Sequence, residues 1–325
     1  MLSYLVERVF QSVLVLLVIT LVGFVLFRYV GDPVLNMVGQ DVTQKQIDQM
    51  REDLGLNDPL VVQYVRYLGR AATGQFGMSF RHGRPVIELF AERLPATIEL
   101  VVASTVLGLV LAIPLGVFTG IRPHHPLSQF LLSTSLIGVS LPTFLIGILL
   151  ILTFSVILPW LPSFGRGTVV NLGAWTTGFL TIDGWKHLVL PSVTLGLFQL
   201  TVIMRLVRSE MMEVLRTDYI KFARARGIRP NAIYFGHALR NTLIPVITIT
   251  GLQLGGLLAF AIVTETVFQW PGMGLLFLQA LSVADLPVMS GYLLVVGIIF
   301  VSINFTVDML YLVIDPRLRE GLRAH

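Results

Sequence analysis

The largest group of basic residues in this chain lies within residues 205–245, a polar stretch of the C-terminal two-thirds. Its basic members are Arg205, Arg208, Arg216, Lys221, Arg224, Arg226, Arg229 and Arg240, and its acidic members are Glu210, Glu213 and Asp218. Residues of these types offer recognition by charge. They can steer and hold an acidic partner surface, or they can lie against the anionic inner leaflet of a membrane.

Sequence patterns for catalysis, metal binding or nucleotide binding are missing. A phosphate-binding loop needs glycine before its lysine, and none of the three lysines, Lys45, Lys186 and Lys221, follows a glycine. His124 and His125 are adjacent, so on regular structure their rings point apart, and we expect solvated loop histidines rather than a metal site. The absence of cysteine excludes disulfides and thiolate metal sites. We therefore expect no catalytic residue, no metal and no cofactor, and any ATP hydrolysis must come from another chain.

Four polar side chains lie in or beside long apolar runs. Acidic residues within a membrane are functional candidates by default, but Glu99, Glu265 and Asp308 each lie near the end of a run. We interpret them as solvated end groups or as groups that pair with another subunit. Gln253 lies deep in its run, where it could line a passage for solute or bond a neighbouring helix; the sequence leaves both open.

Apolar residues dominate the composition. The chain has 325 residues, of which 54% are hydrophobic and only 13% charged, whereas soluble domains carry roughly 25% charged residues. Several uncharged runs approach the ~20 residues that cross a bilayer as a helix. The composition predicts an all-α integral membrane protein in contact with membrane lipid. The net charge of +4 is clustered at the ends of runs, which indicates membrane orientation and no nucleic-acid partner.

Six transmembrane helices are predicted from the apolar runs, at residues 9–27, 96–120, 129–161, 187–207, 243–263 and 288–314. Pro95 and Pro245 are expected to start the second and fifth spans. The third run is too long for one straight span, so we expect a bend at Ser140-Leu141-Pro142, because proline removes a backbone hydrogen bond. Basic residues follow the second, fourth and sixth spans. This pattern predicts a protein of the inner membrane with both chain termini in the cytoplasm.

Residues 29–94 differ from the rest and predict a small extracytoplasmic helical cap between spans 1 and 2. Thr43 with Gln46 forms a capping box, and Asp58-Pro59 predicts an N-cap followed by proline at the first helical position. The helix after it is expected to bury one apolar stripe, made of Leu60, Val61, Tyr64, Val65 and Leu68. The expected domains are residues 1–28 as a first span, 29–94 as the cap, and 95–325 as a core with five spans.

Local signals within residues 205–245 indicate a rigid elbow rather than a slack loop. Residues 208–217 extend the fourth span, and residues 219–226 form a second helix that Gly227 closes in the left-handed conformation. Pro230 then restarts a helix at its first turn.

The second helix of this elbow has the features of a docking element. Ala223 and Ala225 keep it slim enough to enter a groove on another protein. Lys221, Arg224 and Arg226 supply charge that would steer an acidic partner.

The elbow resembles the EAA loop of binding-protein-dependent ABC importer permeases, and specifically that of the oligopeptide/dipeptide/nickel branch. Ala223, Gly227 and Leu239 match the general pattern, whereas Lys221 and Phe222 replace its first two triplet positions. His237-Ala-Leu-Arg stands where the general pattern has I-x-L-P, as it does in the peptide branch. Further matches follow in order along the chain: Gly31-Asp32-Pro33, Leu54-Gly55-Leu56, the turn that begins at Gly74, the stretch Thr264 to Gly274, Asp308, and Asp315-Pro316-Arg317.

This resemblance implies a type I permease core over residues 95–325, with the EAA loop at about 205–245. The implied partners are a second homologous permease subunit, two cytoplasmic ABC ATPase subunits and an extracytoplasmic solute-binding protein. The implied ATPase-coupling residues are Asp218, Tyr219, Lys221, Phe222, Ala223, Arg224, Ala225, Gly227, His237, Leu239 and Arg240. The implied function is ATP-driven import of peptides or similar small solutes, and the sequence does not choose among peptides, glutathione, nickel chelates and oligosaccharides.

Two other classes of function remain as alternatives to this interpretation. A stand-alone secondary carrier or channel is expected to show inverted halves with broken midplane helices, and a membrane-embedded enzyme needs paired catalytic residues within its spans. The sequence shows neither feature.

Overall fold

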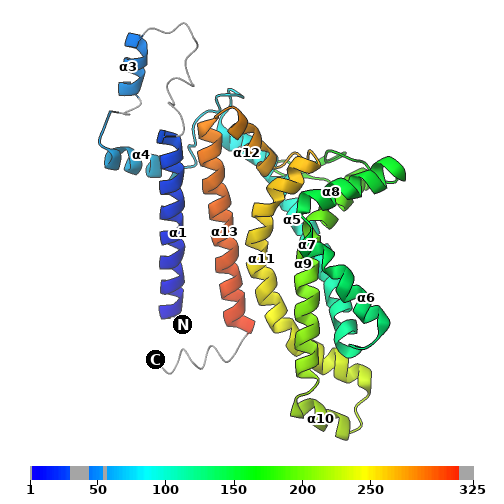
Figure 1. Ribbon diagram of the computed structural model, residues 1–325. Coiled ribbons are helices and arrows are strands. Elements are labelled where there is room, and N and C mark those ends of the chain that lie inside the picture. The colour runs from blue at the N-terminus through cyan, green and yellow to red at the C-terminus, as the bar shows by residue number, and fades with distance from the viewer. Residues whose placement is uncertain (1, 30–43, 54–56, 315–325) are drawn as a thin grey trace. The chain divides into compact units, whose positions relative to one another are not determined.

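The computed structural model describes residues 2–29, 44–53 and 57–314, and these are largely helical (Figure 1). Within these ranges five helices are long and apolar enough to cross a membrane, and a bent pair makes a sixth if it counts as one span. The prediction of an all-α membrane protein is confirmed. Thr43 of the capping box and the motifs Gly31-Asp32-Pro33, Leu54-Gly55-Leu56 and Asp315-Pro316-Arg317 lie outside the described residues.

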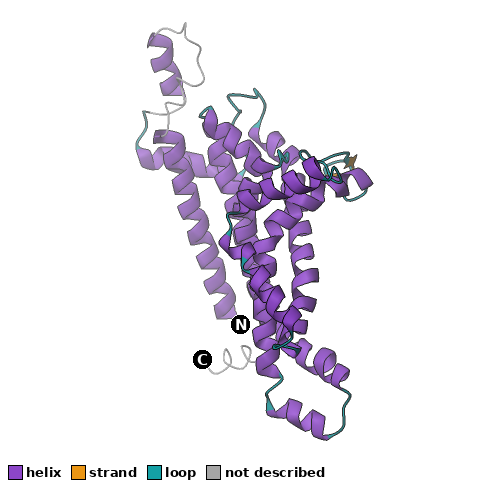
Figure 2. Cartoon of the chain, turned by 45° about the vertical axis from the view of Figure 1, so that its right-hand side comes forward, coloured by secondary structure: helices purple, strands orange, loops and turns teal. Residues whose placement is uncertain are grey.

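The elements follow in chain order. The helices are α1 (Leu2–Tyr29), α3 (Gln44–Asp53), α4 (Leu60–Ala72), α5 (Val86–Ile121), α6 (Pro126–Ser135), α7 (Ile137–Ser140), α8 (Thr143–Ile151), η1 (Leu152–Ile157), α9 (Ile182–Val214), α10 (Asp218–Ala225), η2 (Ala232–Ala238), α11 (Leu239–Val267), α12 (Met273–Ser282) and α13 (Leu286–Ile314). Two short strands, β1 (Val170–Asn171) and β2 (Thr176–Thr177), pair between η1 and α9 (Figure 2).

The second and fifth spans do not begin at proline as predicted. The helix α5 begins at Val86 and continues through Pro95, so the predicted domain boundary at residue 95 falls inside a helix. The helix α11 begins at Leu239 and contains Pro245. Membrane helices tolerate proline because neighbouring groups and local adjustments satisfy the freed backbone atoms. The helix α9 begins at Ile182, before the predicted start at residue 187, and it continues to Val214, in agreement with the predicted extension of the fourth span over residues 208–217.

The predicted break in the third span is confirmed. The pair α6–α7 and the pair α8–η1 meet at an angle of 109° around Leu141 and Pro142. Proline at this position lacks the N–H that would continue the helix.

Contacts divide the chain into two compact units, and α5 and α13 each contribute to both. In the first unit, which comprises residues 1–97, 171–177 and 271–305, α4 packs on α1 through polar and aromatic groups. The hydroxyls of Tyr64 and Thr20 hydrogen bond at 2.8 Å, and the ring of Phe24 meets that of Tyr64 at 5.6 Å between centroids. This contact lies on the apolar run of α1, so α4 lies beside a membrane-crossing segment.

The predicted buried stripe of α4 is wrong for three of its five members. They are mostly exposed: Leu60 (51%), Val61 (73%) and Val65 (61%). The helix also begins one residue later than predicted, with Pro59 as its N-cap. An amphipathic helix beside a span can direct its apolar face to the lipid interface rather than to a protein core. The prediction treated α4 as part of a soluble cap and therefore assigned its apolar face to a protein core.

A buried carboxylate holds the turn before α5 in the first unit. Asp285 is 1% exposed and accepts hydrogen bonds from the Ser79 hydroxyl and from the backbone N–H groups of Phe80 and Arg81. These bonds join residues about 200 positions apart in sequence, so the loop that begins at Gly74 is fixed to the start of α13.

The second unit, residues 98–170, 178–270 and 306–325, is organised around α9. Close approach of α5 to α9 depends on glycine: a Cβ at Gly116 would lie 2.6 Å from Val207 Cβ, and one at Gly120 would lie 2.8 Å from Met211 Cβ. Gly116 and Gly120 form a G-x-x-x-G pair on one face of α5, an arrangement that lets membrane helices pack closely. Any side chain larger than hydrogen at Gly116 or Gly120 would therefore push α5 away from α9.

Candidate functional site: the elbow between α9 and α11

The elbow is a short helical excursion at one end of α9, followed by a return into α11. Figures 1 and 2 both show α10 beyond the end of α9, with the chain folding back through η2. The turn between α9 and α10 is closed by Thr217, whose hydroxyl donates to the Val214 carbonyl at 2.6 Å. Pro230 and Asn231 are helical and lead into η2. The predicted order of helix, glycine corner and helix is confirmed.

Gly227 ends α10 in a complete Schellman motif. Its φ is +73°, and its N–H donates to the Arg224 carbonyl at 3.0 Å while the Ile228 N–H donates to the Ala223 carbonyl at 3.3 Å. Ala223 and Ile228 also belong to the same apolar cluster, which is the hydrophobic contact that accompanies this motif. Glycine thus sets the direction in which the chain leaves α10.

An apolar cluster fixes the elbow to the membrane helices as one body. The elbow contributes four buried residues, Ile220, Ala223, Ile233 and Ala238, and these join α9 and α5 residues including Val207, Met211 and Val117. Interiors packed in this way are stiff and transmit strain. A displacement of α10 is therefore coupled to the end of α9.

The outer face of α10 is aromatic and basic. Phe222 is 64% exposed and Tyr219 is 43% exposed, and the Arg226 guanidinium lies over the Phe222 ring at 5.7 Å from its centroid. Lys221 is paired with Asp218 at 2.8 Å, with both side chains largely in solvent. Exposed aromatic and arginine side chains are the types that dominate binding energy at protein interfaces.

The return helix adds further exposed groups to this region. Phe235 is 58% exposed, and His237 and Arg240 are exposed, whereas Leu239 is half-buried. The Asn241 side-chain amide donates to the Tyr219 hydroxyl at 2.6 Å, so the start of α11 is tied directly to α10.

The structure brings the predicted coupling residues together in one elbow but divides them between two faces. Ala223 is 7% exposed and packs into this chain's own core, so it shapes the elbow rather than offering surface, unlike the slim docking edge that we expected. Ala225, Arg224 and Gly227 are exposed. Sequence reasoning missed Phe235 and Asn241. The helical spacing of Phe235 from Leu239 could have indicated the former, but no local signal marks the bond of Asn241 to Tyr219.

Two of the three acidic residues near the span ends, Glu99 and Glu265, are more deeply buried than predicted, whereas Asp308 is half-buried. Glu99 is 2% exposed and forms an ion pair with Arg166, while its second oxygen accepts the Gly178 N–H at 2.8 Å. Glu265 is 0% exposed. The expectation of solvated end groups is therefore wrong for both, and Glu99 pairs within its own chain. The reason is that Arg166 and Gly178, from the segment between η1 and α9, fold against α5 at Glu99, a contact that a linear sequence does not show.

The structure also places Gln253 and His125, which the sequence had singled out. Gln253 is half-buried, and its Oε1 has no hydrogen-bond partner among the described residues. His125 is exposed and caps α6, because its Nδ1 accepts the Leu127 N–H at 3.1 Å. That histidine serves the helix end, in agreement with its interpretation as a loop residue.

Family models for binding-protein-dependent transport match nearly the whole chain. The model for the inner membrane component matches residues 112–320, and the model for the N-terminal part of the membrane component matches residues 1–101. The chain belongs to this family. It is a multi-pass permease subunit of an ABC importer, a class that works with ATPase and binding-protein components.

Relatives of this permease align with nearly its full length. It is 38% identical to the oligopeptide transport system permease protein AppB of Bacillus subtilis, over 98% of this chain and 99% of that one. It is 37% identical to the dipeptide permease DppB of Alkalihalophilus pseudofirmus (98% and 100%) and 38% identical to the di/tripeptide permease DppB of Pseudomonas aeruginosa (98% and 99%).

Solved structures agree on the fold. A chain of the inward-facing MetNI methionine ABC transporter matches with a TM-score of 0.56 at 20% identity, covering 70% of this permease and 97% of that chain. At this identity the match shows a shared permease fold.

Proposed function

We propose that this permease translocates peptides, and that the outer face of the elbow is where a cytoplasmic ATPase engages it. The observation that carries the coupling proposal is the contrast within α10: Phe222 is 64% exposed while Ala223, the next residue, is 7% exposed in the core. A rigid body that presents an exposed aromatic residue suits docking, because little conformational entropy is lost on binding.

The peptide substrate is proposed from the relatives. Three permeases of 37–38% identity, aligned over 98% of this chain, are named for oligopeptides, dipeptides or di- and tripeptides. An extracytoplasmic binding protein would deliver the peptide to a pore formed with a second homologous permease, and two ATPase subunits would supply the energy. Basic residues in the elbow favour a cytoplasmic position for that end of α9, and with it for both chain termini.

Substitution of Phe222 by alanine tests the docking face. We expect the permease to fold normally, because the side chain is mostly in solvent, but to bind its ATPase roughly 30-fold more weakly, as for an interface hot spot worth about 2 kcal/mol. Affinity is measured between the detergent-solubilised permease pair and the purified ATPase. The matched control is Phe130→Ala on α6, since Phe130 is also 64% exposed. Equal ATPase affinity for the two variants would exclude this docking face.

A further inference from the structure

A basic pocket lies between α6 and α9, beyond the point where these two segments touch. At the contact the Thr201 hydroxyl donates to the Ser135 carbonyl at 3.0 Å, and a Cβ at Gly138 would lie 2.6 Å from Thr201 Oγ1. One turn further along α9 a pocket of about 440 Å³ opens, a size within the roughly 300–1,000 Å³ of small-molecule sites. Along α9, the packing is therefore close at Thr201 and open one turn later, at Arg205.

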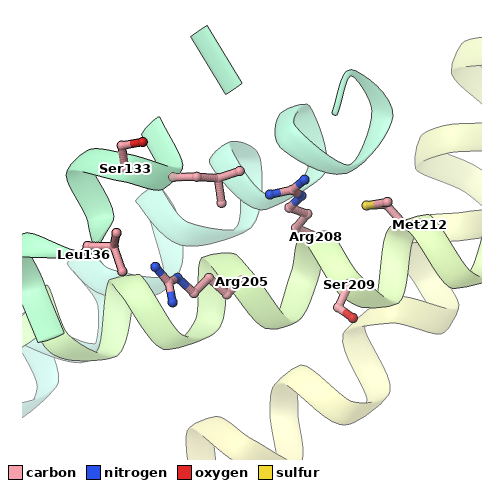
Figure 3. A pocket seen from close by; sticks show the side chains of 7 residues that line it. Ser133, Leu136, Arg205, Arg208, Ser209 and Met212 are labelled. Carbon is pink, nitrogen blue, oxygen red and sulfur yellow. The ribbon is translucent and has the colours of Figure 1, made fainter. Parts of the chain in front are cut away.

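The pocket combines positive charge with apolar walls. Arg205 and Arg208 line it from α9, and Figure 3 shows both guanidinium groups on the side of α9 that faces α6. Ser133 adds a hydroxyl, and the remaining walls include Leu132, Leu136 and Met212. A ligand that fits must carry an anionic, oxygen-rich group joined to an apolar body.

The two arginines have no ion-pair partner among the described residues. In each salt bridge that the described residues form, the carboxylate pairs with a residue other than Arg205 or Arg208. A guanidinium group presents a fork of donors that matches phosphate. The two side chains are three positions apart on a helix and therefore neighbours on one face, so they can hold a single phosphate group together.

The position of the pocket along α9 indicates a lipid headgroup. Residues 187–204 carry no Asp, Glu, Lys or Arg, and Arg205 is the first such residue after them. Arg205 and Arg208 thus lie where the apolar span ends, which is the depth of headgroup phosphates, and basic pockets between membrane helices on the cytoplasmic side are suited to anionic headgroups.

We propose that this pocket binds the phosphate of an anionic phospholipid of the cytoplasmic leaflet, with its acyl chains along the apolar walls. The lipid would brace α6 against the part of α9 that leads into the elbow. The choice of leaflet rests on the cytoplasmic orientation of the elbow, which is part of the proposed function.

The test is a titration of the delipidated permease, purified with its partner permease and ATPase subunits, by phosphatidylglycerol or by phosphatidylcholine of equal chain length, read by native mass spectrometry. An arginine at an anionic surface contributes about fivefold, so phosphatidylglycerol should bind roughly 25-fold more tightly, and the variant Arg205→Gln/Arg208→Gln should lose this preference. Arg205→Lys/Arg208→Lys should retain part of it. The control variant Arg81→Gln, which removes one exposed positive charge in the other unit, should retain all of it.

Four results would overturn the proposal. The first is equal binding of the two lipids by the wild type, and the second is an unchanged preference in the double glutamine variant. The third is displacement of phosphatidylglycerol by inorganic phosphate at similar concentrations, which would mark a site for free anions. A cross-link from Ser133→Cys to the partner permease would also overturn it, because a protein would then fill the pocket; the chain has no other cysteine.

Failure of the proposed function would look different from any of these results. The orientation is tested by labelling Arg216→Cys with a membrane-impermeant maleimide. Labelling from outside intact cells would refute the cytoplasmic elbow, and lipid selectivity would still be measured independently of transport.

Discussion

At the scale of single residues, the shape of the elbow depends on the backbone of Gly227. Its φ of +73° lies in the left-handed region, and a Cβ added at this position would have no heavy atom within 4 Å. A side chain there would therefore meet open space, and the cost of a substitution would arise from backbone conformation alone. For a non-glycine residue that cost is about 1–2 kcal/mol, and it is greater for a β-branched residue.

We expect Gly227→Val to abolish solute uptake while the protein still inserts into the membrane. The substitution removes the left-handed cap, so α10 and η2 meet at a different angle and the docking face is displaced. Uptake of a labelled peptide is measured in cells alongside the amount of permease in the membrane. Gly227→Asn should keep much of the activity, because asparagine tolerates the left-handed region.

Gly69→Val is the matched control for this experiment. Gly69 also has open space around it, but it lies in α4 with an ordinary helical backbone. Normal uptake by Gly227→Val, or an equal loss of uptake in both variants, would show that transport does not depend on the left-handed turn at Gly227.

The ion pair between Glu99 and Arg166 makes a second prediction for single residues. Both side chains are less than a tenth exposed, and loss of one partner leaves a buried charge uncompensated, at a cost of roughly 3–5 kcal/mol. We expect Arg166→Met to lower the thermal stability of the purified transporter sharply. The double variant Glu99→Gln/Arg166→Met should recover much of the loss, and its failure to do so would show that Arg166 acts through other contacts.

At the scale of elements, the packing of α5 on α9 connects the elbow to the membrane. We expect Gly116→Ala to destabilise the permease by about 1–3 kcal/mol, the usual cost of overpacking, because the new Cβ would lie 2.7 Å from the Met204 carbonyl oxygen as well as 2.6 Å from Val207. Thermal unfolding in detergent measures the effect. Gly256→Ala in α11 is the control, since a Cβ there meets no atom within 4 Å; an equal change in both would argue against close packing.

The elements also show which features local sequence could predict. Apolar runs identify the spans, and Gly227 with Pro230 identifies the elbow, because each signal acts within a few residues of its cause. The exposed face of α4 and the course of α5 through Pro95 were missed, since both depend on neighbours supplied by the membrane or by distant helices.

Contacts of long range lie beyond such reasoning. Arg166 reaches Glu99 across 67 positions, and Ser79 reaches Asp285 across 206. The elbow was identified by its local pattern, while the inward position of Ala223 required the folded core of α5 and α9 to be known.

At the scale of the whole molecule, the proposed function divides the work between this permease and a separate source of energy. Its three lysines lack the glycine that a phosphate-binding loop requires, and the elbow face has the chemistry of a protein contact rather than of a nucleotide site. On the proposed function, energy enters through the elbow from a separate ATPase. We expect the purified permease alone, or paired with its homologous partner, to bind no ATP.

Equilibrium binding with labelled ATP tests this expectation, and reconstitution extends it. Vesicles with the permease pair alone should not accumulate peptide, whereas vesicles that also hold the ATPase subunits and receive the binding protein should do so with ATP hydrolysis. The Phe222→Ala variant should reduce peptide accumulation in the complete system, because the ATPase would bind α10 more weakly. Accumulation against a gradient by the permease pair alone would instead require an ion-driven carrier and would contradict the coupling through the elbow.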